Sequence, residues 1–263
     1  MPDATVVGSG PNGLAAALVL ARAGLEVEVA EAVPTVGGGA RSEPFEGMPE
    51  LSFDFGSAVH PFVPESEFFR RWEATARVPY LTPHISFAHP LDGGRAAIAY
   101  RNLKDTTEGL GTDGDSWHRT FAQLANASTR TADLALNPAL AGWRQPAGLA
   151  RVGTSALRTA LGGLGQFHGQ EAKALFTGVM AHANASFPSL ATASVGLVLT
   201  SLAHGQGWPL PRGGAAKLTS AMVQDLRRYG GQIHLGRRIT DAREIANSKI
   251  VIQQGTIRRP LVS

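Results

Sequence analysis

The chain has 263 residues, of which 43% are hydrophobic and 17% charged, a composition typical of a folded globular protein and not of a disordered one. Its net charge of +3 comes without a long basic run, so the sequence gives no support for nucleic-acid binding. The absence of cysteine excludes disulfides, thiolate metal sites and a cysteine nucleophile.

The beginning of the chain predicts a strand, a helix and a second strand. ATVV (4–7) is typical of a buried strand, and the alanine- and leucine-rich GLAAALVLARAG (13–24) of a helix that closes at its final glycine. In LEVEVAEA (25–32) valine alternates with glutamate, as in a strand with one buried face. The three elements fit within about 30 residues, the length of a βαβ unit.

The middle of the chain predicts a β-hairpin and then mostly helices, up to about residue 206. HISFAHPLDGGRAAIAYRN (84–102) has Asp92-Gly93-Gly94 at the expected turn. A helix is predicted to begin in GDSWHRTFAQLANAS (114–128), with Asp115 as its N-cap. The longest apolar run, ASVGLVLTSLA (193–203), is too short and too polar to span a bilayer.

The last part of the chain returns to an α/β pattern. An amphipathic helix is predicted from about Ala215 to Tyr229, with Leu218, Met222 and Leu226 on the face toward a sheet. A strand should follow its glycine pair, and KIVI (249–252) predicts one more.

The first βα turn carries the motif with the clearest chemistry, Gly8-Ser9-Gly10-Pro11-Asn12-Gly13. Gly8 permits the sharp turn, Gly10 the approach of a pyrophosphate, and Gly13 close packing of the helix on the strand. Glu31 follows Gly8 by 23 positions, at the place where a carboxylate can accept hydrogen bonds from the ribose hydroxyls of a dinucleotide. A carboxylate at this place disfavours a ligand with a 2′-phosphate. We therefore expect a dinucleotide other than NADP; the alternative is an ordinary turn beside an exposed glutamate.

The stretch VPTVGGGARSEPF (33–45) decides between NAD and FAD, because a glycine-rich loop stands where a NAD dehydrogenase usually continues through helix and strand. Three segments carry a resemblance to a known family: Gly37-Gly38-Gly39-Ala40-Arg41-Ser42, FDFGSAVHPF (53–62) and GWPLPRGGAAKLTSAM (207–222). Together with the glycine turn and Glu31 they resemble the phytoene desaturase-like FAD-dependent oxidoreductases, which are related to the amine oxidases. The resemblance covers nearly all of the chain to about Val251.

This resemblance implies an α/β fold in which a Rossmann-like FAD/NAD(P)-binding domain is split in sequence by an inserted helix-rich cap domain. Residues 1–60 and 206–263 would form the FAD-binding domain, and 61–205 a mostly helical substrate domain with a β-hairpin. The glycine turn (8–13) would hold the FAD pyrophosphate, and Glu31 would hold the adenosine ribose. The second glycine loop (37–39) would lie along the phosphates and the ribityl chain. The strand that follows the helix ending at Gly230-Gly231 would lie near the adenine. The expected cofactor-binding residues are Gly8, Gly10, Pro11, Asn12, Gly13, Glu31, Gly38, Gly39, Arg41 and Ile239.

The activity that the resemblance implies is flavin-dependent oxidation of the dehydrogenase or desaturase type, with hydride passing from a hydrophobic or amine-like small molecule to the flavin. No residue stands out as a catalytic acid or base. Two alternatives stay open: a NAD-dependent dehydrogenase, and an inactive fragment that binds only the ADP part of FAD. Family members are usually about twice this length and carry a second glycine motif near their C-terminus, which this sequence lacks. The resemblance therefore suggests an N-terminal fragment whose last dozen or so residues are out of frame.

Other residues have a structural and a functional interpretation. His60 would either line the substrate cavity or be a loop histidine with its hydrogen bond satisfied, and the second interpretation is favoured. Trp208 would either pack in the core or form part of the cavity wall. The eight histidines show no ligand spacing, so no metal is expected. The first strand starts within a few residues of Met1 and leaves no room for a signal peptide, which predicts a cytoplasmic protein without a transmembrane segment. Peripheral membrane contact and the oligomeric state are left open.

Overall fold

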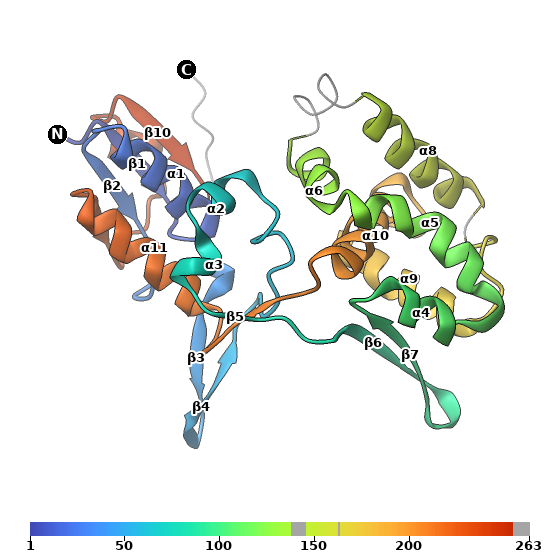
Figure 1. Ribbon diagram of the computed structural model, residues 1–263. Helices are drawn as coiled ribbons and strands as arrows, with labels where there is room; N and C mark the ends of the chain where they lie inside the picture. Colours follow the sequence, from blue (N-terminus) through green and yellow to red (C-terminus); the bar gives the residue numbers. More distant parts are fainter. Residues whose placement is uncertain (138–145, 163, 255–263) are drawn as a thin grey trace. The chain divides into compact units, whose positions relative to one another are not determined.

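The computed structural model describes residues 1–137, 146–162 and 164–254. The chain divides into two compact units (Figure 1). Unit 1 consists of Met1–Val59, Ala76–Tyr80 and Leu210–Ser263, and unit 2 of His60–Thr75 and Leu81–Pro209. The chain thus contributes three separate segments to unit 1.

Unit 1 is built on a parallel four-stranded sheet, in the order β10-β1-β2-β9. Its strands are β1 (Ala4–Val7), β2 (Val27–Ala30), β9 (Gln232–His234) and β10 (Ile250–Gln253). All four residues of β1 are buried, as expected for a strand with a neighbour on each side and a helix against it. The predicted strands at 4–7, 25–32 and 249–252 are therefore confirmed.

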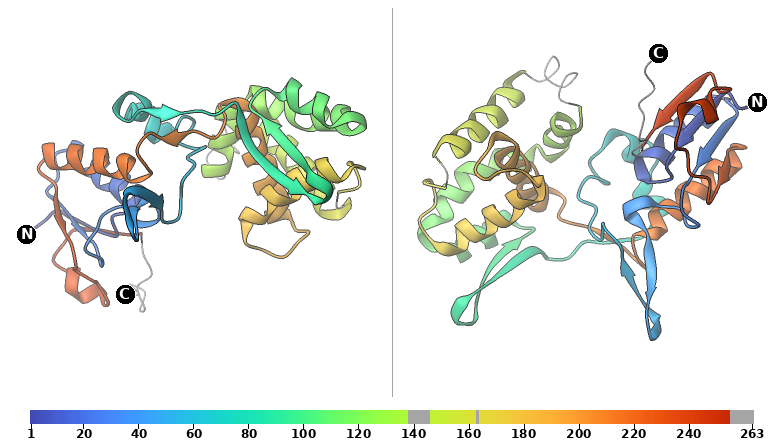
Figure 2. Two further views of the ribbon diagram at one scale, coloured as in Figure 1. Left: turned by 90° about the horizontal axis from the view of Figure 1, so that it is seen from below. Right: turned by 180° about the vertical axis from the view of Figure 1, so that it is seen from behind.

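Two helices of unit 1, α1 (Pro11–Arg22) and α11 (Ala216–Arg228), pack side by side (Figures 1 and 2). The apolar stripe predicted for α11 is confirmed, because Leu218, Met222 and Leu226 are at most 2% exposed. The first strand, α1 and β2 form the predicted βαβ unit.

A buried carboxylate ties the segments of unit 1 together. The carboxylate oxygens of Asp225 in α11 lie 3.5 Å from a guanidinium nitrogen of Arg22 in α1, 2.9 Å from one of Arg77 and 3.1 Å from one of Arg228. Arg77 belongs to the short segment 76–80, so this ion cluster attaches that segment to both helices. A buried charge that loses such partners is strongly destabilising.

A two-stranded antiparallel ribbon follows the second glycine loop of unit 1. It consists of β3 (Ser42–Phe45) and β4 (Met48–Asp54), with Ser42 opposite Asp54 and Glu43 opposite Phe53. Figures 1 and 2 show the ribbon extending away from the parallel sheet.

Unit 2 combines a β-hairpin with a group of helices. The predicted hairpin is confirmed: β6 (Ile85–Leu91) pairs with β7 (Arg95–Tyr100), and Asp92–Gly94 forms the turn. The larger helices are α4 (Leu103–Gly109), α5 (Gly114–Asn126), α6 (Ser128–Leu136), α8 (Pro146–Gly162), α9 (Gln170–Met180) and α10 (Leu190–Gly205). A shorter helix of unit 2 is α2 (Glu67–Arg71). The chain also contains α3 (Ala74–Arg77), which begins in unit 2 and ends in unit 1, and the strand β5 (Tyr80–Leu81), which pairs with β8 (Leu210–Pro211) of unit 1. No helix within 1–137, 146–162 and 164–254 is long and apolar enough to cross a membrane.

The core of unit 2 is aromatic. Trp117 and Phe121 of α5 pack with Phe167 and with Phe176 of α9, all at most 1% exposed. The indole Nε1 of Trp117 donates to Nε2 of the buried His204, and the other ring nitrogen of His204 bonds the carbonyl of Tyr100 at 2.8 Å. Burial lowers the pKa of His204 to about 4, so the ring is neutral at pH 7.

The start of α5 corrects one expectation. Asp115 is not the N-cap; it lies in the first helical turn, and the N-cap position is occupied by Asp113. A 3₁₀ turn over Gly111–Asp113 runs directly into the helix, so no residue there has the extended conformation of a capping residue. The buried Asp113 carboxylate instead accepts from the amides of His168 and Gly169, at 2.9 and 2.6 Å.

Candidate functional site

The glycine turn joins β1 to α1 through a very close backbone approach. Gly8 has φ of 101°, in the left-handed region, and a β-carbon on Gly13 would lie 2.1 Å from the Gly8 carbonyl oxygen. Gly10 is the N-cap of α1 and Pro11 its first residue, and no side chain caps this helix end. The first turn of α1 therefore presents main-chain N–H groups and the positive end of the helix dipole to an anion.

The second glycine loop lies directly on this turn. The Gly37 amide donates to both the carbonyl oxygen and the hydroxyl of Ser9, at 3.1 and 3.2 Å. A β-carbon on Gly38 would come within 3.0 Å of the Gly10 Cα. Two segments 28 residues apart thus form one surface of bare main chain, which is what close approach to a pyrophosphate requires.

Glu31 stands at the end of β2, next to this surface. It is 8% exposed and therefore not the exposed glutamate of the alternative interpretation. One carboxylate oxygen accepts from the amide and the hydroxyl of Ser9, at 2.8 and 2.6 Å, and the other from the amide of Val33 at 3.1 Å. Burial would raise the pKa of Glu31, but the hydrogen bonds from Ser9, Val33 and Ala32 outweigh it and hold that pKa below its ordinary value. Glu31 is therefore a fixed anion at neutral pH.

Ser9 is the residue that the sequence motif did not single out. It is completely buried, and its hydroxyl donates to Glu31 while accepting from the Gly37 amide. One side chain therefore joins the first βα turn, the end of β2 and the second glycine loop. A small hydroxyl residue between the glycines is the only trace of this role in the sequence.

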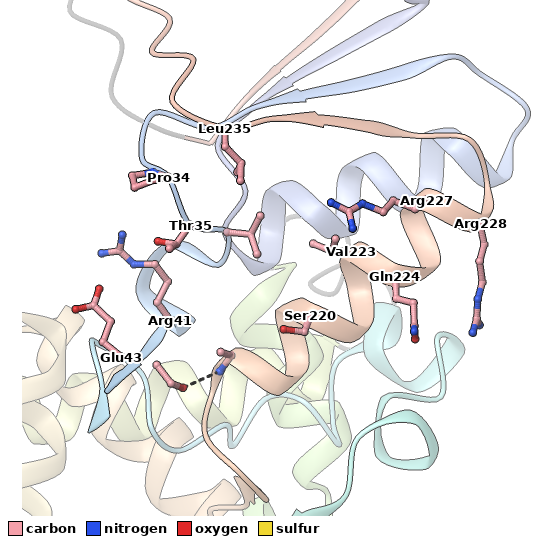
Figure 3. Close-up of a pocket in the computed structure, with 13 residues that line it drawn as sticks. Pro34, Thr35, Arg41, Glu43, Ser220, Val223, Gln224, Arg227, Arg228 and Leu235 are labelled. Atoms are coloured by element: carbon pink, nitrogen blue, oxygen red, sulfur yellow. Dashed lines mark hydrogen bonds between the residues drawn. The ribbon is translucent and has the colours of Figure 1, made fainter. Parts of the chain in front are cut away.

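Arg41 follows the second glycine loop and lines an open groove of about 820 Å³ (Figure 3). Its guanidinium stacks 4.6 Å over the Phe55 ring, and its buried Nε has no hydrogen-bond partner within the described part of the chain. In Figure 3 the groove runs between Thr35 and Arg41 on one side and the α11 residues Ser220, Gln224 and Arg227 on the other. The glycine turn and Glu31 do not line it; Arg41 is the predicted site residue that borders it.

The FDFG and PRGG segments meet at the start of α11. The Ser42 hydroxyl donates to the Asp54 carboxylate at 2.6 Å and accepts from the Ala216 amide at 3.0 Å, the bond drawn in Figure 3. The same Asp54 oxygen accepts from the Ala215 amide at 2.8 Å. This helix end is therefore neutralised from within the protein, whereas the N-terminus of the neighbouring α1 has no such cap.

The other predicted binding residues are placed as follows. Asn12 is exposed in the first turn of α1, and Gly39 is exposed within the short turn Gly38–Ala40. The side chain of Ile239 is 6% exposed and packs in a core cluster with Val7, Ala30 and Ile245.

His60 and Trp208, for which the sequence left two interpretations open, are both buried in unit 2. Trp208 is 7% exposed, donates from Nε1 to the Leu199 carbonyl at 3.2 Å and packs against Phe87, which confirms the core interpretation. His60 is also 7% exposed, and its amide donates to the Pro209 carbonyl. Within the ranges that the structure describes, no three His, Asp or Glu residues gather where they could hold a metal ion.

Unit 2 contains an apolar cavity of about 570 Å³. Phe62, Leu134, Val152, Val198 and Leu199 line it, with His182 and Ser194 as polar groups. A mainly apolar wall with a few polar groups is the usual character of a small-molecule site.

Comparisons with known proteins agree with this fold. A family model described as a NAD(P)-binding Rossmann-like domain matches residues 6–73. No curated protein matches the sequence.

Among solved structures, an oxidoreductase from Methanosarcina mazei is similar over 95% of this chain and 58% of its own, with 19% identity and a TM-score of 0.53. Cyclohexylamine oxidase from Brevibacterium oxydans is similar over 88% of this chain and 51% of its own, with 19% identity and a TM-score of 0.53. A putrescine oxidase variant is similar over 88% and 50%, with 18% identity and a TM-score of 0.52. The chain thus spans between half and three fifths of the length of these proteins, and it shares their α/β fold with a Rossmann-like dinucleotide-binding domain.

Proposed function

We propose that unit 1 binds FAD and that the chain carries the cofactor-binding part of a flavin-dependent oxidoreductase. The observation that carries the proposal is the arrangement around Ser9. An ionised, buried Glu31 and the uncapped N-terminus of α1 flank a surface of bare main chain made by Gly10 and Gly38. An anion would bind at the helix end and ribose hydroxyls at the carboxylate.

The residues present fit such a group. A β-carbon on Gly38 would fill the space against Gly10, and the buried Nε of Arg41 has a hydrogen to donate and no described partner. In the proposal Gly8, Gly10, Pro11, Asn12 and Gly13 hold the pyrophosphate, Gly38, Gly39 and Arg41 border the phosphates and ribityl chain, and Ile239 lies near the adenine. A carboxylate at the ribose disfavours a 2′-phosphate.

The proposed reaction is oxidation of the dehydrogenase or desaturase type. Bound FAD would supply the hydride acceptor, while the protein supplies binding and orientation. The apolar cavity in unit 2 favours a hydrophobic small molecule, and the names of two proteins of the same fold, putrescine oxidase and cyclohexylamine oxidase, favour an amine. Residues 1–60 and 206–263 would then act as the FAD domain and 61–205 as the substrate domain of a cytoplasmic, phytoene desaturase-like protein.

Two other functions have an observation in their favour. The matching family model is described as NAD(P)-binding, which favours a NAD-dependent dehydrogenase. The chain spans only about half of the two amine oxidases it resembles in fold, which favours a polypeptide that binds the ADP part of FAD without catalysis.

One experiment separates the three. The purified chain is mixed with FAD, desalted and scanned in the visible range, and its affinities for FAD, ADP and NAD are measured by calorimetry. Retained flavin absorbance in equimolar amount supports the proposal. A colourless protein that binds ADP supports the fragment, and binding of NAD in preference to FAD supports the dehydrogenase.

A variant pair tests the site itself. Glu31→Gln removes the anion and is expected to weaken FAD and ADP binding by about tenfold or more, because hydrogen bonds to a charged group are worth about 1.5–3 kcal/mol. Glu26→Gln changes an exposed glutamate on the preceding segment and should leave both affinities unchanged. Equal affinities for the two variants would remove Glu31 from the site.

A further inference from the structure

The β3–β4 ribbon presents large apolar side chains to solvent. Phe45, Met48, Leu51, Phe53 and Phe55 are each between 43% and 57% exposed. They lie within one stretch of eleven residues, whereas exposed apolar side chains of a monomer are normally scattered singly. We call this stretch, Phe45–Phe55, the apolar ribbon.

The apolar ribbon is held in a defined conformation at its base. Ser42 and Asp54 bind each other and the start of α11, and the Phe55 amide donates to the Arg41 carbonyl at 2.8 Å. Further along, the rings of Phe45 and Phe53 meet edge to face with centroids 6.4 Å apart. The aromatic side chains are therefore presented on a fixed element.

The ribbon also lacks the partners that a sheet of this kind normally has. Within the described residues, β3 and β4 pair with each other and with no further strand. Two strands alone are marginally stable in water, and a third strand or a packed layer is the usual remedy. Pro44 and Pro49 have no N–H group, so a partner would be held by side chains more than by main-chain pairing.

The negative charge of the ribbon favours some binding partners over others. Glu43, Glu46, Glu50 and Asp54 lie between residues 42 and 55, and no lysine or arginine does. A second copy docked ribbon to ribbon would bring like charges together, and an anionic lipid surface would repel the same carboxylates. A polypeptide with apolar and basic side chains satisfies both the exposed rings and the acidic groups.

The solved relatives indicate where such a polypeptide comes from. The chain covers 50% to 58% of their length, so each of them contains a large part of its polypeptide outside the matched region. We propose that the apolar ribbon is a docking surface for a polypeptide segment with alternating apolar and basic side chains, the counterpart of that unmatched part.

The test uses the full chain and a fluorescently labelled short peptide of alternating arginine and valine. Anisotropy should show saturable binding that weakens with added salt, whereas a peptide of alternating glutamate and valine should not bind. The double variant Phe45→Ser/Phe53→Ser should weaken binding of the arginine peptide by about tenfold or more, since it removes two aromatic contact surfaces. Val19→Ser, which removes an exposed side chain of α1, should leave binding unchanged.

A second variant separates charge from packing. Glu46→Gln/Glu50→Gln should fold normally, because both residues are exposed, and should weaken binding at low salt and flatten its salt dependence. The proposal is overturned if the arginine peptide does not bind, or if both peptides bind equally. It is also overturned if the chain is a dimer that Phe45→Ser/Phe53→Ser dissociates, or if phosphatidylserine vesicles bind the chain and the same variant abolishes it.

Discussion

Replacing Ser9 by alanine removes a single buried hydroxyl that joins three segments of unit 1. The hydroxyl donates to ionised Glu31 at 2.6 Å and accepts from the Gly37 amide at 3.2 Å. The Gly37 amide also donates to the Ser9 carbonyl, so it keeps a partner in Ser9→Ala. The loss therefore falls on the hydrogen bond to the carboxylate.

The expected magnitude follows from that bond. A hydrogen bond to a charged group contributes about 1.5–3 kcal/mol, and an oxygen of Glu31 retains the Ser9 amide at 2.8 Å. We expect Ser9→Ala to lower the free energy of unfolding of unit 1 by about 2 kcal/mol at pH 7. Ser220→Ala, an exposed serine on α11, should change it by less than about 0.5 kcal/mol.

The effect should depend on pH in a defined direction. The pKa of Glu31 is below its ordinary value in the folded protein, so the stability from its ionised form is complete above the ordinary glutamate range, about 4.3, and is lost as the pH falls through the folded pKa. The difference between the unsubstituted chain and Ser9→Ala should therefore be constant from about pH 7 to 5 and shrink below about pH 4.

Urea denaturation followed by circular dichroism at pH 7 and at acidic pH measures both quantities. Stability of Ser9→Ala equal to that of Ser220→Ala at pH 7 would refute the role of the hydroxyl. A stability difference that stays constant into acid would refute its action through Glu31.

Three further predictions concern other parts of the two units. Gly13→Ala places a β-carbon 2.1 Å from the Gly8 carbonyl oxygen and should lower the free energy of unfolding of unit 1 by about 3 kcal/mol in urea denaturation. Gly153→Ala, whose β-carbon lies in open space on α8, should stabilise unit 2 by about 0.5 kcal/mol. Equal effects of the two substitutions would contradict the close approach of Gly13 to Gly8. Asp54→Ala removes the cap of α11 and should cost about 1–2 kcal/mol in the same assay, and an unchanged midpoint would show that the cap contributes nothing. Burial lowers the pKa of His204 to about 4, so as the pH falls the imidazole is protonated in the unfolded chain before it is protonated in the folded one. The free energy of unfolding should therefore decrease as the pH drops from about 6.5 to 4. His204→Gln should abolish this pH dependence, and a pH dependence that persists in the variant would belong to another group.

The local elements were predictable because their signals are local. The alternation of valine and glutamate, the Asp92-Gly93-Gly94 turn and the apolar stripe of α11 each lie within one element. The close contact of Gly8 and Gly13 likewise belongs to one turn, and a known motif describes it.

What escaped prediction depends on residues far apart in the chain. Asp54 caps a helix that starts 162 positions later, and Asp113 bonds amides 55 and 56 positions away, which is why Asp115 was wrongly assigned as a cap. No periodicity or capping rule contains that information, because these bonds exist only once the units have folded. The exposure of the apolar ribbon is similar: its residues are as apolar as a core strand, and only the structure shows that they are not covered.

The order of the parallel sheet has a consequence for how the protein is made. β1 is synthesised long before one of its two neighbours, β10, with which it pairs so that Ala4 lies opposite Ile250. Unit 2 is formed mainly by the unbroken stretch 81–209 and can fold while β9 and β10 are still being synthesised. During that interval β1 and β2 present unpaired edges on both sides, so the rate of translation through β9 and β10 governs how long the nascent chain is open to aggregation.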